Sequence, residues 1–245
     1  MDPITLILIA LAVIILVIVG ILLYRTSHFA IELPEDYLIP LEAVNGEEVA
    51  RHIGLAIQMK TISHADPEKV DPLPFEGLRN LLQVLYPQVE DHLTREVING
   101  GALLYTWQGT DPDLEPIALA AHQDVVPANE APDSGWSYPP FAGEIADGYV
   151  WGRGALDCKG SLISIMEAVN NLIRDGFKPQ RTVYLLFGHD EECSGSRGAV
   201  ELASVLDARG GRLALLLDEG GSITRGTLPG VDSPVAMIGV TEKGH

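Results

Sequence analysis

The sequence predicts an α/β domain, in which helices cover both faces of a largely parallel central sheet, preceded by one transmembrane helix. Two observations carry this prediction. The run from Ile4 to Leu23 contains no charged residue. From residue 102 onward, short apolar runs of strand type alternate with segments whose apolar residues recur at helical spacing, a pattern typical of layered α/β domains.

The run from Ile4 to Leu23 is long enough to cross a membrane, because a helix rising about 1.5 Å per residue would match the ~30 Å hydrocarbon core. The alternative is a cleaved signal peptide, whose apolar core is usually only about 7 to 15 residues long. We assign residues 1–25 as an anchor and residues 26–45 as a linker. We expect a single-pass membrane protein with its domain on the extracytoplasmic or lumenal side, although Asp2 and Arg25 alone do not fix the orientation.

The composition of the chain excludes two classes of protein. Its net charge is −18, and its basic residues are scattered, whereas nucleic-acid binding needs clustered Lys and Arg. We therefore expect no nucleic-acid partner. Only two cysteines are present, Cys158 and Cys193, so the chain is not a disulfide scaffold.

The elements of the domain follow from periodicity and from turn residues. The expected helices are 47–60, 75–85 ended by Pro87, the segment between Gly160 and Gly176, and 199–208. The expected strands are 102–107, 117–121, 181–188 and 212–221. Between two short runs, Asp147-Gly148 predicts a hairpin turn.

Three of the expected strands end in acidic residues or a histidine, and a loop delivers a fourth group just before a helix. These residues are His122 and Asp124, Asp157, Glu191 and Glu192, and Asp218 and Glu219. In open α/β sheets, ligands bind at the carboxyl ends of the strands. We therefore expect these side chains to share one site.

One imidazole with several carboxylates is a ligand set suited to zinc, with manganese or cobalt as related possibilities. Without a cation, so many carboxylates would repel one another. Asp124 stands two residues from His122 and can orient its ring by a hydrogen bond. Because Glu191 and Glu192 are adjacent, they point in different directions, so that one can bind metal while the other acts as a base.

Four motifs in this order, "HQDVVP", "WGRGALDCKG", "GHDEECSG" and "LLDEGG", carry a family resemblance. The sequence resembles the co-catalytic zinc metallopeptidases of the aminoacylase, glutamate carboxypeptidase and carboxypeptidase S family, and most of all the carboxypeptidase S and N-fatty-acyl-amino-acid hydrolase branch. The resemblance extends from about residue 45 to residue 245. Thirty-five positions separate His122 from Asp157, and thirty-five separate Asp157 from Glu192.

The resemblance implies a site with two Zn²⁺ ions. His122 would bind one ion, Glu192 the other, and Asp157 would bridge them. One residue of the pair Asp218 and Glu219 would add a further carboxylate.

The resemblance also implies roles around the metals. Glu191 would be the general base, and Asp124 would orient the ligand histidine. The Asp157-Cys158 peptide would be cis, and both cysteines would line or back the site without binding metal. His189 would only form local hydrogen bonds.

Family members insert a lid domain after a segment similar to "TEKG" and then return to the catalytic domain, which supplies a second ligand histidine. By this comparison, residues 46–245 correspond to the amino-terminal part of the catalytic domain, and His245 is a poor candidate for that ligand. We expect the 245-residue chain alone to be inactive.

We therefore expect a membrane-anchored zinc hydrolase that cleaves an amide bond beside a free carboxylate, in a peptide or an N-acyl amino acid. A non-catalytic, membrane-tethered binding domain on the same fold is one alternative, although it would not need both Glu191 and Glu192. An aminopeptidase with a similar dinuclear site is another. The acyl or side-chain preference and the oligomeric state stay open.

Overall fold

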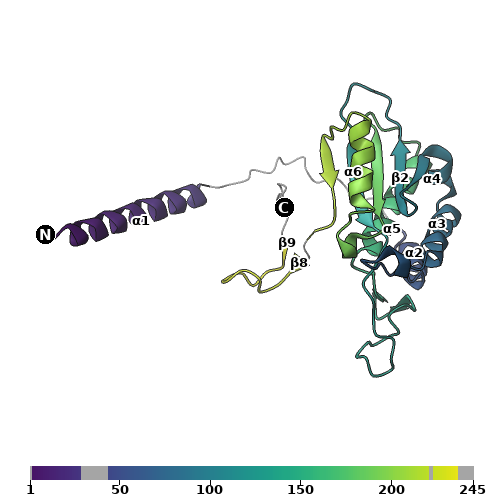
Figure 1. The fold of residues 1–245 in the computed structure, drawn as a ribbon, viewed down its shortest axis with the longest axis horizontal. Coiled ribbons are helices and arrows are strands. Elements are labelled where there is room, and N and C mark those ends of the chain that lie inside the picture. The colour runs from purple at the N-terminus through teal and green to yellow at the C-terminus, as the bar shows by residue number, and fades with distance from the viewer. Residues whose placement is uncertain (1, 29–43, 221–222, 237–245) are drawn as a thin grey trace. The chain divides into compact units, whose positions relative to one another are not determined.

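A computed structural model describes residues 2–28, 44–220 and 223–236 of the chain (Figure 1). The chain divides into two compact units, Met1–Val44 and Asn45–His245.

The described part of the first unit is one helix, α1 (Pro3–Ser27). It begins at Asp2, whose carboxylate accepts hydrogen bonds from the backbone N–H groups of Ile4 and Thr5, at 3.0 Å each. No residue of α1 is buried, and the helix is long and apolar enough to cross a membrane. The helix extends two residues into the segment expected to be linker, and residues 29–43 of that segment lie outside the described residues.

Five α-helices belong to the described part of the second unit, and they agree with the helices expected from periodicity. They are α2 (Gly46–Gln58), α3 (Leu73–Leu85), α4 (Pro87–His92), α5 (Lys159–Arg174) and α6 (Ala199–Ala208). The short helix α4 was not expected. Pro87 stops α3, but it also opens α4, because proline suits the first turn of a helix. Two short 3₁₀ turns, η2 (Pro67–Lys69) and η3 (Glu191–Cys193), complete the helical elements.

The central sheet has five strands in the order β1-β2-β6-β3-β7. They are β1 (Thr94–Ile98), β2 (Ala102–Trp107), β6 (Val183–Gly188), β3 (Ile117–His122) and β7 (Leu215–Leu217). Strand β2 is antiparallel to both neighbours, whereas β6, β3 and β7 are mutually parallel. Four of the five strands therefore share one direction, which confirms a largely parallel sheet. Strand β7 is shorter than the run expected at 212–221.

Two small antiparallel pairs lie outside this sheet. Strands β4 (Glu144–Ala146) and β5 (Tyr149–Trp151) form the expected hairpin, and its turn residues Asp147 and Gly148 have φ of 54° and 80°. The other pair is β8 (Ile223–Thr224) with β9 (Val235–Ala236).

Helices cover both faces of the central sheet, as expected for a layered domain (Figure 1). On one face, buried residues of β2 and β6 pack with α2, α3, α4 and α5. On the other face, the same strands pack against Leu202 and Leu206 of α6. Successive residues alternate between the two faces, as the pleat requires: Leu103 faces the four helices and Leu104 faces α6.

The register of β3 and β6 positions the candidate site. His122, the last residue of β3, pairs with Gly188, the last residue of β6. Since the two strands are parallel and end together, the segments that follow them emerge side by side.

Candidate metal centre

His122 lies at the centre of the acidic cluster, with a side chain only 2% exposed. Its Nδ1 is 2.9 Å from the carbonyl O of Asp124 and 3.3 Å from the Oδ1 of the same residue. Its Nε2 is 2.9 Å from Oδ1 of Asp157, 3.5 Å from Oε2 of Glu219 and 3.9 Å from Oε2 of Glu191. One ring nitrogen is therefore held by Asp124, and the other faces the carboxylates.

Asp124 has a second set of contacts that the sequence did not reveal. Its side chain is fully buried, and its two carboxylate oxygens accept the backbone N–H groups of Glu191 and Glu192, at 3.1 Å each. Asp124 therefore joins the end of β3 to the turn η3 that carries both glutamates. The two residues are 67 and 68 positions away in the chain, so no local pattern predicts the contact.

Two groups of side chains have the composition and spacing to bind a metal. Ligand atoms of His122, Asp157 and Glu192 lie within 4.8 Å of one another, and so do those of His122, Cys158 and Glu219. The structure thus brings together the imidazole and the carboxylates predicted as ligands. Among the described residues, Asp218 joins neither group. Its Oδ1 accepts the backbone N–H of Glu219 at 2.8 Å instead.

The electrostatics of the cluster favour a cation. Burial, followed by neighbouring carboxylates, raises the pKa of Glu191 and of Glu192 above the ordinary value. Burial lowers the pKa of His122, but hydrogen bonds with Asp124 and Cys158 outweigh it and raise this pKa to about 12. Without metal, a protonated His122 is thus the positive charge held among these carboxylates.

Comparison with known proteins identifies the family. Residues 118–234 match Peptidase family M20/M25/M40. Over 240 residues the chain is 38% identical to probable carboxypeptidase S-like 2 of Dictyostelium discoideum, covering 93% of this chain and 46% of that protein. The chain belongs to the M20/M25/M40 peptidase family.

Two further relatives lie in the branch that the motifs indicated. Mouse (Mus musculus) N-fatty-acyl-amino acid synthase/hydrolase PM20D1 is 40% identical over 210 residues, which are 84% of this chain and 41% of that protein. Carboxypeptidase S of Saccharomyces cerevisiae is 46% identical over 153 residues, which are 61% of this chain and 27% of that protein. The chain thus spans less than half the length of these relatives.

Solved structures agree with the fold. Human carnosine dipeptidase 1 matches 73% of this chain and 40% of its own, with a TM-score of 0.57 and 18% identity. An M20 family metallo-carboxypeptidase from Sulfolobus solfataricus matches 72% of this chain and 38% of its own, with a TM-score of 0.53 and 21% identity.

The M20/M25/M40 family is metal-dependent, typically with zinc. The donor set of this chain fits such a group: one buried imidazole nitrogen faces several carboxylates whose charges lack a permanent cation. This fit rests on side-chain chemistry and on the spacing of the ligand atoms.

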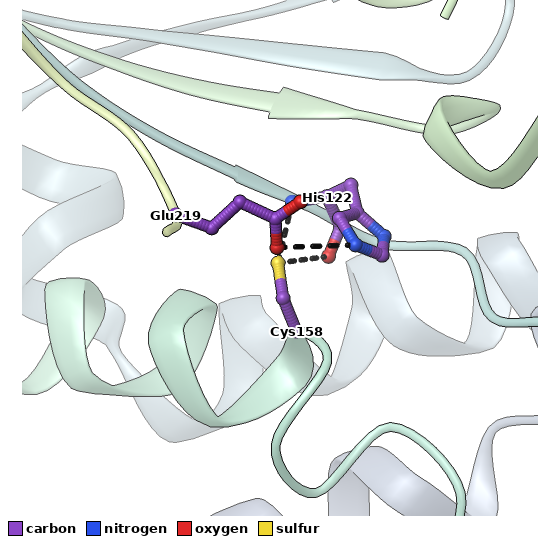
Figure 2. A group of neighbouring side chains, drawn as sticks. All are labelled: His122, Cys158 and Glu219. Carbon is purple, nitrogen blue, oxygen red and sulfur yellow. Dashed lines mark hydrogen bonds and ion pairs between the residues drawn. The ribbon is translucent and has the colours of Figure 1, made fainter. Parts of the chain in front are cut away.

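Cys158 backs the site of this M20-family chain, as Figure 2 shows. Its buried Sγ accepts the backbone N–H of His122 at 3.0 Å, and the Glu219 carboxylate approaches from the end of β7 (Figure 2). The Asp157-Cys158 peptide is cis, which confirms that prediction. Cys193 lies farther along the chain, with its Sγ 3.4 Å from Oγ of Ser63.

His189 differs from the expectation of local hydrogen bonding. Its Nδ1 is buried and has no hydrogen-bond partner among the described residues. The ring instead packs edge-on against Phe75, with centroids 6.4 Å apart. Burial also lowers the pKa of His189, so the ring is held in its neutral form.

An apolar cavity of about 370 Å³ opens beside the cluster. His122, Glu191 and Glu219 line its polar end. Its apolar walls come from β3, β6, α6 and the segment leading into β7, and include Leu186, Leu202, Leu206, Leu213 and Leu216. The cavity therefore places an apolar surface next to the candidate metal ligands.

Proposed function

We propose that the chain belongs to a membrane-anchored zinc hydrolase that cleaves an amide bond next to a free carboxylate, in a peptide or an N-acyl amino acid. The observation that supports it most is the arrangement around His122. Its Nε2 faces Asp157, Glu219 and Glu191, while Glu192 lies within ligand distance of the first of these.

Two Zn²⁺ ions would be held by the residues that the cluster brings together. His122 and Glu219 would hold one ion, Glu192 the other, and Asp157 would bridge them. Glu219 is favoured over Asp218 because its carboxylate approaches the imidazole, whereas that of Asp218 accepts a backbone N–H. When bound, zinc would polarise the scissile carbonyl and lower the pKa of a water molecule.

Glu191 is the proposed general base. It is half-exposed, with a side-chain exposure of 51%, and adjoins a proposed ligand without belonging to either metal-binding group. Burial and the surrounding carboxylates raise its pKa toward the range in which a carboxylate exchanges protons efficiently. Glu191 would take a proton from the attacking water and then deliver it to the leaving amine.

The relatives and the cavity support an acyl or peptide substrate. One relative is named as an N-fatty-acyl-amino acid synthase/hydrolase and another as carboxypeptidase S. The apolar walls beside the cluster suit the aliphatic part of such a substrate. A binding domain without catalysis would gain nothing from a second glutamate beside the ligand, and an aminopeptidase would select a free amine instead.

The decisive experiment is hydrolysis of N-acyl amino acids by the protein at its natural length, loaded with zinc. Glu191→Gln should keep the metal content and lose at least about 10²-fold in kcat, the low end for general-base catalysis. Glu201→Gln, an exposed glutamate of α6, is the matched control and should leave kcat unchanged. Normal turnover by Glu191→Gln with normal zinc would overturn the assignment. Preference for substrates with a free amine over a free carboxylate would favour the aminopeptidase.

A further inference from the structure

Lys159 is the most unusual buried group outside the cluster. It is the first residue of α5, two positions after Asp157, and its side chain is fully buried. Lysine is almost never fully buried unless its charge is paired. Among the described residues, however, no carboxylate forms an ion pair with Lys159. Burial lowers the pKa of this amine to about 7, so its position in the interior costs stability.

The amine of Lys159 binds the end of another helix. Nζ donates to the carbonyl O of Ala56, at 3.0 Å, and to the carbonyl O of Met59. These residues belong to the last turn and the C-cap of α2. The carbonyls at a helix C-terminus lack intrahelical partners and carry the negative end of the helix dipole, so they suit a cationic donor.

The chain just after α2 is also attached to the segment that follows His122. Thr61 accepts the backbone N–H of Val125 through its carbonyl, at 3.0 Å. Its hydroxyl donates to the carbonyl O of Gln123, at 2.6 Å. Ile62 and Val125 form an isolated parallel bridge. The end of α2 therefore contacts both segments that bear proposed ligands, the one after β3 and the one before α5.

The stem of Lys159 also packs at this junction. A Cβ placed on Gly154 would lie 2.8 Å from Cγ1 of Val125 and 3.3 Å from Cδ of Lys159. Gly154 also has φ of 89° and accepts the backbone N–H of Lys159, at 2.9 Å. Only glycine fits here without displacing one of these two side chains.

We propose that Lys159 is a positioning residue for the metal site: by binding the end of α2, it fixes Asp157 opposite His122. The proposal rests on the metal site of the proposed function. The observed separation of 2.9 Å between Asp157 Oδ1 and His122 Nε2 is the distance that this contact maintains. Lys159 touches neither residue's ligand atoms and acts through the backbone.

A purely structural role for Lys159 would give a different result. Replacing an unpaired buried amine by an apolar side chain of similar length is often neutral or stabilising for the fold. If Lys159 only filled space, Lys159→Met would keep the affinity for zinc. If it positions Asp157, the fold persists while the affinity for zinc falls.

The test is titration of the full chain, in detergent, with zinc alone. Lys159→Met should weaken zinc binding about tenfold or more, as changes next to metal ligands commonly do. Its thermal unfolding without metal should not be lowered. Lys159→Arg, which restores a cationic donor, should recover affinity to within about threefold of the natural protein. Lys178→Met, at an exposed lysine, is the matched control and should bind zinc normally.

A second variant keeps the proposal testable if Lys159→Met does not fold. Thr61→Val removes the hydroxyl contact to Gln123 at the other attachment of the same junction, and it should also weaken zinc binding. Unchanged zinc affinity in a folded Lys159→Met, or in Thr61→Val when Lys159→Met does not fold, would overturn the positioning role alone. Absence of zinc binding by the natural chain would instead overturn the proposed function on which the role rests.

Discussion

At the scale of single residues, Glu219 and Asp218 are adjacent but have different surroundings. The carboxylate of Glu219 lies 3.5 Å from Nε2 of His122, whereas Asp218 accepts the N–H of its neighbour. Glu219→Gln should therefore weaken zinc binding about tenfold or more, the size of effect seen even for partners of metal ligands. Asp218→Asn should change it by less than about threefold. Calorimetric zinc titration of both variants checks the assignment, and the reverse order of effects would make Asp218 the ligand.

The pKa of His122 gives a prediction on pH. Since hydrogen bonds raise this pKa to about 12, the metal-free site holds the proton well above the ordinary value. A metal-bound imidazole must be neutral, so zinc has to displace that proton. The apparent affinity for zinc should rise by about tenfold per pH unit from pH 6.5 to 8.

Measuring zinc binding in buffers of different ionisation enthalpy counts the protons released. About one proton per zinc bound at His122 is the expected result at neutral pH. An affinity that does not change over this pH range would show that the imidazole is already neutral in the metal-free protein.

The sequence predicted the members of the site better than their contacts. His122, Asp157 and Glu192 could be chosen because each follows or precedes an element whose end lies at one edge of the sheet. The choice between Asp218 and Glu219 depends on side-chain direction, which strand alternation alone leaves open. The contacts of Asp124 with the N–H groups of η3 join distant segments, so they needed the fold.

At the scale of elements, the packing of α2 against the segment before β4 depends on glycine. A Cβ on Gly54 would lie 2.7 Å from the carbonyl O of Gly143, whereas a Cβ on Gly46, in the same helix, would have nothing within 4 Å. Alanine favours a helix over glycine by up to about 1 kcal/mol at both positions. Gly46→Ala should therefore leave stability unchanged or raise it slightly.

Gly54→Ala should lower the free energy of unfolding by about 1 to 3 kcal/mol, because overpacking outweighs the gain in helix propensity. Chemical denaturation of the two variants checks this difference. Equal stability of Gly54→Ala and Gly46→Ala would mean that the contact between α2 and Gly143 yields without cost.

Elements with strong periodicity were predicted well, and those defined by pairing were not. Strand β2 has the residues expected, and α6 has both expected ends. Strand β1 was missed because "TREVI" is mostly polar and gains its stability by pairing with β2. Asn99-Gly100 between them, with φ of 47° and 77°, is a hairpin signal that could have revealed this strand.

At the scale of the whole molecule, the two units have opposite surface chemistry. The domain has a core on each face of its sheet. The helix α1 has no buried residue, and its large apolar side chains are exposed all round, for example Leu11 at 50% and Leu16 at 70%. A helix that is apolar on every side has no polar face to keep toward water, so it is not a helix that lies on a membrane surface.

We therefore expect α1 to span a membrane and to retain the protein there. The intact protein should stay in the membrane fraction through a carbonate wash, and deletion of residues 1–28 should release the domain into the soluble fraction. Leu11→Lys together with Ile14→Lys places two charges near the middle of the span, at a cost of about 2.5 to 3.5 kcal/mol each, and should also prevent insertion. Leu11→Ala with Ile14→Ala is the matched control and should remain membrane-bound. Sequencing the amino terminus of the mature protein separates the two readings of the helix. A protein that begins at Met1 and resists the wash has an anchor, whereas a soluble protein that has lost α1 had a signal peptide. A soluble protein that still begins at Met1 would contradict both.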